Sequence, residues 1–296
     1  MLQTLIFGLS SGAIYALMAL AIGIIYSTTR IFNFCHASII MTGAMVAYYC
    51  IGVYHMPYVV GVLVAIAVNC VINIVLYYVC LKGLGDLTTT SNWMITLFGA
   101  GLLLNNGARM VFGANENPFP YLFNGASFAI GSANILWHEI GMIVFAVVIG
   151  ASYQLLCQKT RFGRALRAVS FKPRTARLMG INSDAIIQVC FLMAAAVAAI
   201  GGVLIAPTTF ASFNMTTTIG LKGYAAAVLG GIGDTKGAFI GGFLLGLMEC
   251  IVTMFVPAGL KDAFSFVLMI VVIIFLPGGV LSAKIFTHGR SATEKV

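Results

Sequence analysis

The chain has 296 residues, of which 60% are apolar and 8% are charged, and its mean hydropathy is +1.03. Because soluble domains carry about 25% charged residues, this composition excludes a soluble protein and indicates an integral membrane protein. The formal net charge of +8 does not indicate nucleic-acid binding, since the basic residues gather in one loop and in the tail and not over a folded soluble face.

Nine apolar segments predict the fold class, an all-α polytopic membrane protein with about nine membrane-embedded helices. Most are about 20 residues long, as a helix needs to cross a ~30 Å hydrocarbon layer. The segment at 221–233 is about 20 Å long at helical rise, so we expect one short or broken helix there. The segments are residues 2–27, 37–53, 58–81, 92–112, 135–158, 185–206, 221–233, 237–256 and 263–281.

The connection between the first two segments reads RIFNFCHAS and contains Asn33 and His36. The two lie three residues apart and share one face if the connection is helical. Polar groups at a helix break line a water-filled path in some membrane proteins. The alternative is an interfacial connector anchored by Phe32 and Phe34, and the sequence favours neither.

Residues 159–184 form the longest hydrophilic loop. Positive charge is typical of cytoplasmic loops. If the N-terminus lies outside, the other basic positions fall on the same side of the membrane as this loop. We therefore expect an external N-terminus, a cytoplasmic C-terminus and a single transmembrane domain over residues 1–296. The loop holds seven of the sixteen Lys and Arg residues, Lys159, Arg161, Arg164, Arg167, Lys172, Arg174 and Arg177; the other basic positions on this side are Arg30, Lys82, Lys236, Lys284, Arg290 and Lys295.

Within this loop a short helix is predicted from Pro173 to Gly180. Proline suits the first position of a helix and glycine the position after its end. Ala176, Leu178 and Met179 would give this helix an apolar surface between arginines. It is either a docking element for a cytoplasmic partner or a loop that only follows the charge bias. Upstream, residues 163–169 are expected to extend the preceding span.

The late part of the chain combines glycine repeats with one acid inside a span. Gly233, Gly237 and Gly241 are spaced by four, as are Gly242 and Gly246, and such spacing favours close helix packing in membranes, with a transport path through the glycines as the alternative. Glu249 is the acid inside a span. It is either a structural polar anchor or an ion-coupling site.

The sequence does not indicate an enzyme, a metal site or a cofactor. The histidines and cysteines show no metal-ligand spacing. The glycine-rich turn GGIGDTKGAF at 230–239 does not match a phosphate-binding loop, because its lysine precedes the glycine. ATP chemistry, if used, is expected on a separate chain.

Four stretches of the chain carry a family resemblance. They are NFCHASIIMTGA at 33–44, GRALRAVSFKPRTARLMGIN at 163–182, KGYAAAVLGGIGDTKGAFIGGFLLGLME at 222–249 and FLPGGVL at 275–281. They resemble the permease subunits of bacterial ABC importers for branched-chain amino acids, and the short N-terminus resembles the smaller of the two permeases. The likeness covers essentially the whole chain. It implies a bacterial inner-membrane protein that works with a homologous permease subunit, two cytoplasmic ATPase subunits and an external substrate-binding protein.

The resemblance also implies roles for residues. Residues 173–180 correspond to the coupling helix that seats in an ATPase groove. The expected coupling residues are Arg164, Arg167, Pro173, Ala176, Leu178, Met179 and Gly180. For the translocation path or gate we expect Asn33, His36, Gly230, Gly231, Gly233 and Glu249.

The chain departs from the family pattern at two places. It has Ser170-Phe171-Lys172 where the family commonly has an acidic pair, and Cys35 and Ala37 where an alanine and a glycine are common. The function expected is an ABC-importer permease for branched-chain or related small amino acids delivered by an external protein. The alternatives are an ABC permease for urea or amides, an ion-coupled carrier or channel with Glu249 as its ion-linked group, and a membrane scaffold.

Overall fold

The computed structural model describes residues 2–84, 92–121, 126–130, 133–255, 261–275 and 279. The basic tail positions Lys284, Arg290 and Lys295 lie outside these residues. The described chain is mostly helical, as predicted. Its helices are α1 (Leu2–Thr29), α2 (His36–Tyr48), α3 (Tyr58–Leu76), α4 (Asn92–Phe112), α5 (Trp137–Lys159), α6 (Arg161–Phe171), α7 (Pro173–Leu178), α8 (Ser183–Thr209), α9 (Leu221–Gly230), α10 (Thr235–Val252) and α11 (Lys261–Phe275).

Seven helices in the described residues are long and apolar enough to cross a membrane, against the nine segments predicted. Short π-helical turns lengthen two of them, Tyr49–Val53 after α2 and Tyr77–Leu81 after α3. The remaining two segments correspond to shorter helices, α9 and α11. The ten residues of α9 rise about 15 Å, half of a hydrocarbon layer, and a π-helical turn, Thr216–Gly220, precedes them.

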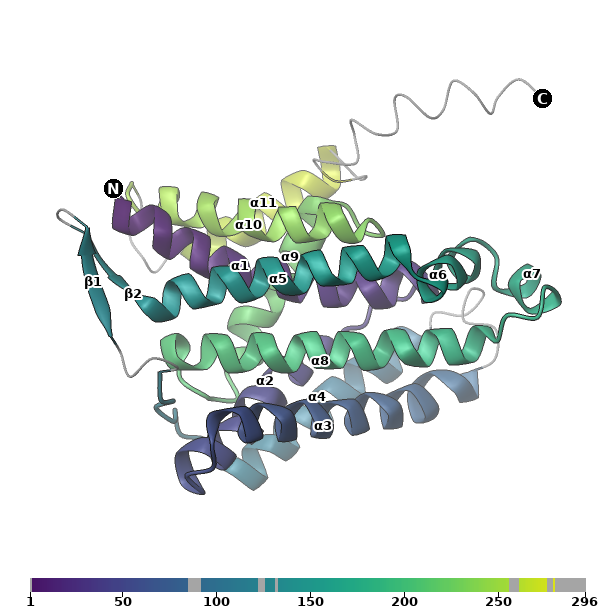
Figure 1. Ribbon diagram of the computed structural model, residues 1–296, viewed down its shortest axis with the longest axis horizontal. Coiled ribbons are helices and arrows are strands. Elements are labelled where there is room, and N and C mark those ends of the chain that lie inside the picture. The colour runs from purple at the N-terminus through teal and green to yellow at the C-terminus, as the bar shows by residue number, and fades with distance from the viewer. Residues whose placement is uncertain are drawn as a thin grey trace.

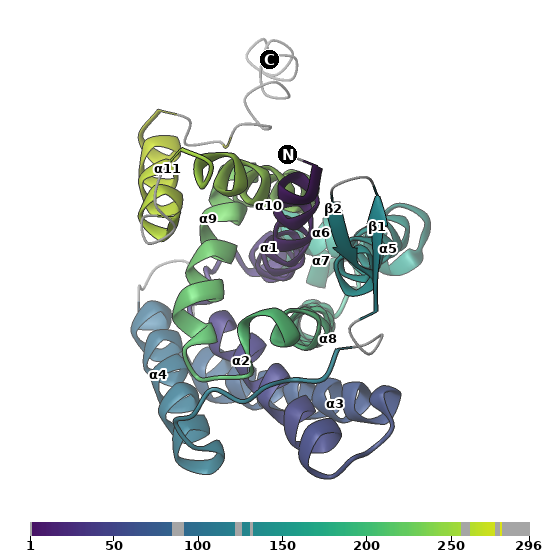
Figure 2. The same cartoon turned by 90° about the vertical axis from the view of Figure 1, so that its left-hand side faces the viewer.

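Helix α1 lies at the centre of the bundle and runs antiparallel to α10 (Figures 1 and 2). Glycines make this close approach possible, as the repeats predicted. A Cβ on Gly12 would press on the backbone of Phe243, and one on Gly246 would clash with the backbone of Gly12. Because lipid gives helices no hydrophobic reason to pair, such backbone contact is what holds them together.

A second glycine contact joins α2 to α8, where Gly202 lies against the backbone of Ile40. The central helices are accordingly enclosed, with 72% of the apolar window buried in both α1 and α8. In α4 and α5 that share is 17%. These outer helices expose large apolar side chains such as Ile95 and Leu103, which suits a surface that meets lipid or another membrane subunit.

A β-hairpin that the sequence analysis did not predict closes one end of the bundle. Strands β1 (Ser127–Ile130) and β2 (Ala133–Leu136) pair antiparallel, with Phe128 opposite Ile135. Nearby in sequence, Asn117 forms a backbone bridge with Ala211, which joins the 113–121 connection to the segment after α8. The hairpin and the pair α6 and α7 lie at opposite ends of the molecule (Figure 1).

Candidate functional site

The basic loop folds as two helices, and the first, α6, is separate from the span before it. We expected residues 163–169 to extend that span, and this was wrong. Thr160 has an extended backbone and its side chain accepts a hydrogen bond from Gly163 N, so it caps a new helix. Gly163, Leu166 and Val169 are buried at intervals of three, while Arg164 and Arg167 are exposed. Helix α6 therefore lies with its apolar face against the bundle.

The second helix, α7, begins and ends as predicted. Pro173 occupies its first position. Gly180 has φ +81, a left-handed conformation that glycine adopts without strain. The amides of Gly180 and Ile181 donate to the carbonyls of Arg177 and Ala176 at 3.0 Å each. These two bonds form a Schellman motif, a hydrogen-bonding pattern that ends many helices.

Polar contacts fix α7 to the start of α8. The Ser183 hydroxyl donates to the Pro173 carbonyl at 3.1 Å. The Arg177 guanidinium donates to the Asp184 carboxylate at 2.8 Å. Asn182 caps α8 by accepting from Ala185 N. A displacement of α7 would therefore be passed directly to α8, which lies inside the bundle.

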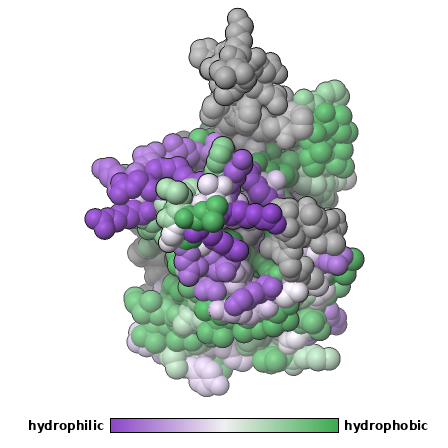
Figure 3. Space-filling model, turned by 90° about the vertical axis from the view of Figure 1, so that its right-hand side faces the viewer, coloured by the Kyte–Doolittle hydropathy of each residue, from purple (hydrophilic) through white to green (hydrophobic). Residues whose placement is uncertain are grey.

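The tip of α7 exposes large apolar side chains at this polar end. Leu178 is 87% exposed and Met179 78% exposed. Ala176, expected on the same surface, is buried, so that part of the prediction was wrong. Figure 3 faces this end and shows apolar surface surrounded by hydrophilic surface. Such a tip, next to arginines and away from the apolar spans, is suited to a protein partner.

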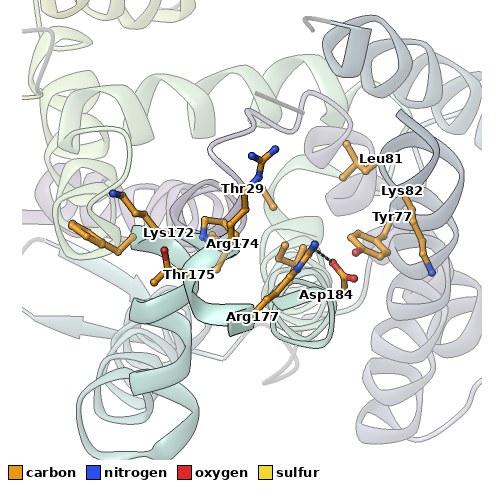
Figure 4. A pocket seen from close by; sticks show the side chains of 13 residues that line it. Thr29, Tyr77, Leu81, Lys82, Lys172, Arg174, Thr175, Arg177 and Asp184 are labelled. Carbon is orange, nitrogen blue, oxygen red and sulfur yellow. Dashed lines mark hydrogen bonds and ion pairs between the residues drawn. The ribbon is translucent and has the colours of Figure 1, made fainter. Parts of the chain in front are cut away.

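A cavity of about 1020 Å³ is lined by α7, the last turn of α1, the π-helical turn after α3 and the start of α8 (Figure 4). Its charged lining is mainly basic, with one carboxylate, Asp184. Thr29, Tyr77 and Leu81 line it from the bundle side. Positive charge at the mouth of such a cavity attracts acidic groups. The basic residues that line it are Lys82, Lys172, Arg174 and Arg177.

A smaller cavity of about 330 Å³ is lined by Arg30, Arg167 and Lys236 together with the turn between α9 and α10. The two cavities thus gather basic residues from five separate parts of the chain at one end of the bundle. The expected coupling residues lie at this end.

The connection before α2 is largely buried and is held by hydrogen bonds. The side-chain Oδ1 of Asn33 accepts a hydrogen bond from the Cys35 amide at 3.0 Å, and the backbone carbonyl of Asn33 accepts one from the His36 amide at 3.1 Å. The Tyr224 hydroxyl of α9 lies 2.9 Å from the carbonyls of both Asn33 and Phe34. His36 is fully buried, and among the described residues neither its ring nitrogens nor Asn33 Nδ2 have a hydrogen-bond partner. Buried polar groups without partners are rare.

The glycines expected in a path or gate form the turn from α9 to α10. Gly231 and Gly233 have φ +106 and +105. Gly230 packs against the backbone of Gly237, and a Cβ on Gly233 would lie 3.4 Å from Arg30. Asp234 then caps α10 by accepting from Lys236 N. Glu249 lies in the last turn of α10, at the opposite end of that helix from the glycine turn.

Glu249 lies 1% exposed in a cluster of polar side chains from four helices. Its Oε2 accepts from the Tyr15 hydroxyl at 3.0 Å and faces Lys261 Nζ at 3.3 Å. Its Oε1 faces Lys222 Nζ at 3.1 Å and accepts from Ser265. Glu249 was expected to be either a structural polar anchor or an ion-coupling site, and none of its four partners was predicted. A signal existed in Lys222, a cation that opens a short apolar segment.

Within the described residues, no three His, Cys, Asp or Glu side chains lie close enough to hold a metal ion.

Residues 4–273 match the family model described as the permease component of branched-chain amino acid transport systems. The high-affinity branched-chain amino acid transport system permease protein LivH of Escherichia coli K12 is 29% identical, covering 100% of this chain and 97% of that protein. BraD of Pseudomonas aeruginosa, a protein with the same description, is 30% identical over 100% and 98%. The xylose/arabinose import permease protein XylH of Sulfolobus acidocaldarius is 30% identical over 54% and 45%.

Proposed function

The chain belongs to the family of permease components of branched-chain amino acid transport systems, and on that basis we propose that it is a membrane subunit of an ATP-driven importer for branched-chain or related small amino acids. The observation that carries this proposal is the match over residues 4–273. Relatives named for branched-chain amino acids align with the whole chain, whereas the sugar permease XylH aligns with about half. The family is a transport subunit, so ATP hydrolysis belongs to a separate chain.

The basic end of the bundle is the cytoplasmic end, and the protein crosses the bacterial inner membrane with its N-terminus outside. Support comes from Arg30, Lys82 and the loop cations, which gather around two cavities at one end, and from the preference of positive loops for the cytoplasm. If α9 and α11 are counted as membrane-embedded helices together with the seven longer ones, the total is nine. An odd number of crossings that starts outside leaves the C-terminus inside.

Helix α7 is the element that a cytoplasmic ATPase holds. Its exposed Leu178 and Met179 would enter an apolar groove, while Arg164 and Arg167 on α6 would face acidic groups around it. One ATPase would sit beneath this chain and the second beneath a homologous permease subunit. An external binding protein would deliver the substrate at the end that carries the β-hairpin.

The buried connection before α2 is the candidate lining of the path. Its unpartnered groups, the His36 ring and Asn33 Nδ2, would meet water or a polar substrate when the subunits open. Gly230, Gly231 and Gly233 form the turn between α9 and α10, and Gly233 lets this turn pass close to Arg30. These glycines contribute backbone shape and no polar side chain.

The test is leucine uptake into proteoliposomes that contain the purified permease pair. We expect uptake only when the ATPase subunits, ATP and the binding protein are present. Uptake that persists without the ATPases and disappears with the proton gradient would favour the ion-coupled carrier and refute the importer.

A further inference from the structure

We propose that Lys222 is a positioning residue that fixes the start of the short helix α9 through the Lys222 cluster, which we define as Tyr15, Lys222, Glu249, Lys261, Asp262 and Ser265. This inference rests on the proposed function, because the movement of α9 matters only in a transport cycle. It assigns α9 the role of a moving element that carries the connection before α2.

Lys222 joins α9 to two other helices. Its Nζ lies 3.1 Å from Glu249 Oε1 on α10 and 2.7 Å from Asp262 Oδ1 on α11. It also lies 5.6 Å from the ring centre of Tyr15 on α1. Because α9 is too short to cross the bilayer alone, contacts of this kind must set its position.

The cluster has two positive and two negative charges, and one of each sign is buried. The Lys222 side chain is 7% exposed and that of Glu249 1% exposed. A buried ion pair is often replaceable by packed apolar groups without loss of stability. The better-attested use of such a pair is to specify one geometry, which is the role assigned to Lys222.

The contacts of Glu249 argue against proton or cation transport through it. Each carboxylate oxygen already has one ammonium group and one hydroxyl beside it, Lys222 and Ser265 at Oε1 and Lys261 and Tyr15 at Oε2. An incoming cation would have to displace one of them. The cluster is therefore a set of mutual contacts and not a vacant binding site.

The two acidic partners of Lys222 differ in burial, and this difference allows movement. Asp262 is 54% exposed, whereas Glu249 is enclosed. Water can replace Lys222 at Asp262 but not at Glu249. Two residues further along α9, the Tyr224 hydroxyl holds the connection before α2. Helix α9 therefore pivots about Glu249 and carries this connection with it when the contact with Asp262 opens.

The experiment compares variants in the complete importer, with partner permease, ATPases and binding protein, by measuring leucine taken up per ATP hydrolysed. The double variant Lys222→Met/Glu249→Gln removes one charge of each sign and keeps side-chain volume. We expect normal assembly and a ratio roughly tenfold lower, within the range of known coupling energies. Asp262→Asn should assemble normally and lower the ratio by a smaller factor.

Lys261→Met is the matched comparison, because it removes a cation from Glu249 without changing α9, and it should lower the ratio by a smaller factor than the double variant. A wild-type ratio in the double variant would overturn the inference, and so would equal losses in Lys261→Met. If the double variant does not assemble and Asp262→Asn couples normally, the cluster serves folding alone. Absence of ATP-dependent uptake in the unmodified importer would instead refute the proposed function.

Discussion

The Arg177 guanidinium on α7 lies 2.8 Å from the Asp184 carboxylate in the first turn of α8, and both side chains are about half exposed. The pair joins the helix at the basic end of the molecule to one of its most enclosed helices. Because both side chains meet solvent, the pair contributes little to stability, and this contribution depends on salt.

Replacing Arg177 by alanine should have little effect on stability. Exposed ion pairs contribute about 0.2–1 kcal/mol and are weakened by salt, so the midpoint of thermal unfolding in detergent should change only slightly, and less at high salt. Asp184→Ala should behave alike, and the double variant should not add to either. A large loss of stability in the single variants would show that the pair behaves as a buried one.

Substitutions at Gly180 should separate docking from folding. Its φ of +81 favours glycine or asparagine, and no atom lies within 4 Å of the position of a Cβ. Gly180→Asn should retain ATP-dependent uptake. Gly180→Glu should lose it, because the new carboxylate stands beside the tip of α7 where a partner would dock, at a backbone cost of roughly 1–2 kcal/mol. Both should insert normally; failed insertion of Gly180→Glu alone would mean that the turn serves folding.

The contact between α1 and α10 should tolerate no side chain at Gly246. Gly246→Ala would press a methyl group against the backbone of Gly12, and such overpacking costs about 1–3 kcal/mol. We expect less protein in the membrane and a lower unfolding temperature. The matched control is Gly107→Ala on α4, where no atom lies within 4 Å and alanine favours the helix by up to about 1 kcal/mol. Equal effects of the two changes would contradict the close packing.

The Cys35 thiol should react slowly with maleimides in intact membranes. Burial raises its pKa from 9.0 to about 12, so at neutral pH the thiol stays protonated, and the reactive thiolate forms only as the pH approaches that value. A Met179→Cys variant lacking the other cysteines provides an exposed reference for the labelling rate. Comparable rates at the two positions in the folded protein would show that the connection before α2 is open to solvent.

Local features of the chain were predictable, and contacts between distant helices were not. Pro173 and Gly180 specify the limits of α7 through backbone geometry that each residue carries alone. The separation of α6 from α5 depends on one cap at Thr160, a signal weaker than the apolar run around it. The hairpin at 127–136 has too few residues to show a clear alternation of apolar and polar positions.

In the candidate site, too, single residues were predictable from the sequence and contacts between helices were not. Glu249 was identifiable because an acid within an apolar span is costly. Its partners were not, because Lys222 and Lys261 stand on other helices and the sequence does not state which helix faces meet. The burial of Ala176 was not predicted for a similar reason. A helix of two turns is too short for its pattern of apolar residues to indicate which face is buried.

The Tyr15 hydroxyl finds its carboxylate 234 positions later in the chain, at Glu249. During synthesis α1 enters the membrane first, and the helix that fits its glycines is made almost last. A chain that stops before α10 would leave the glycine face of α1 uncovered and Tyr15 without its acceptor. The core of the bundle around α1 is therefore completed only when α10 has been made.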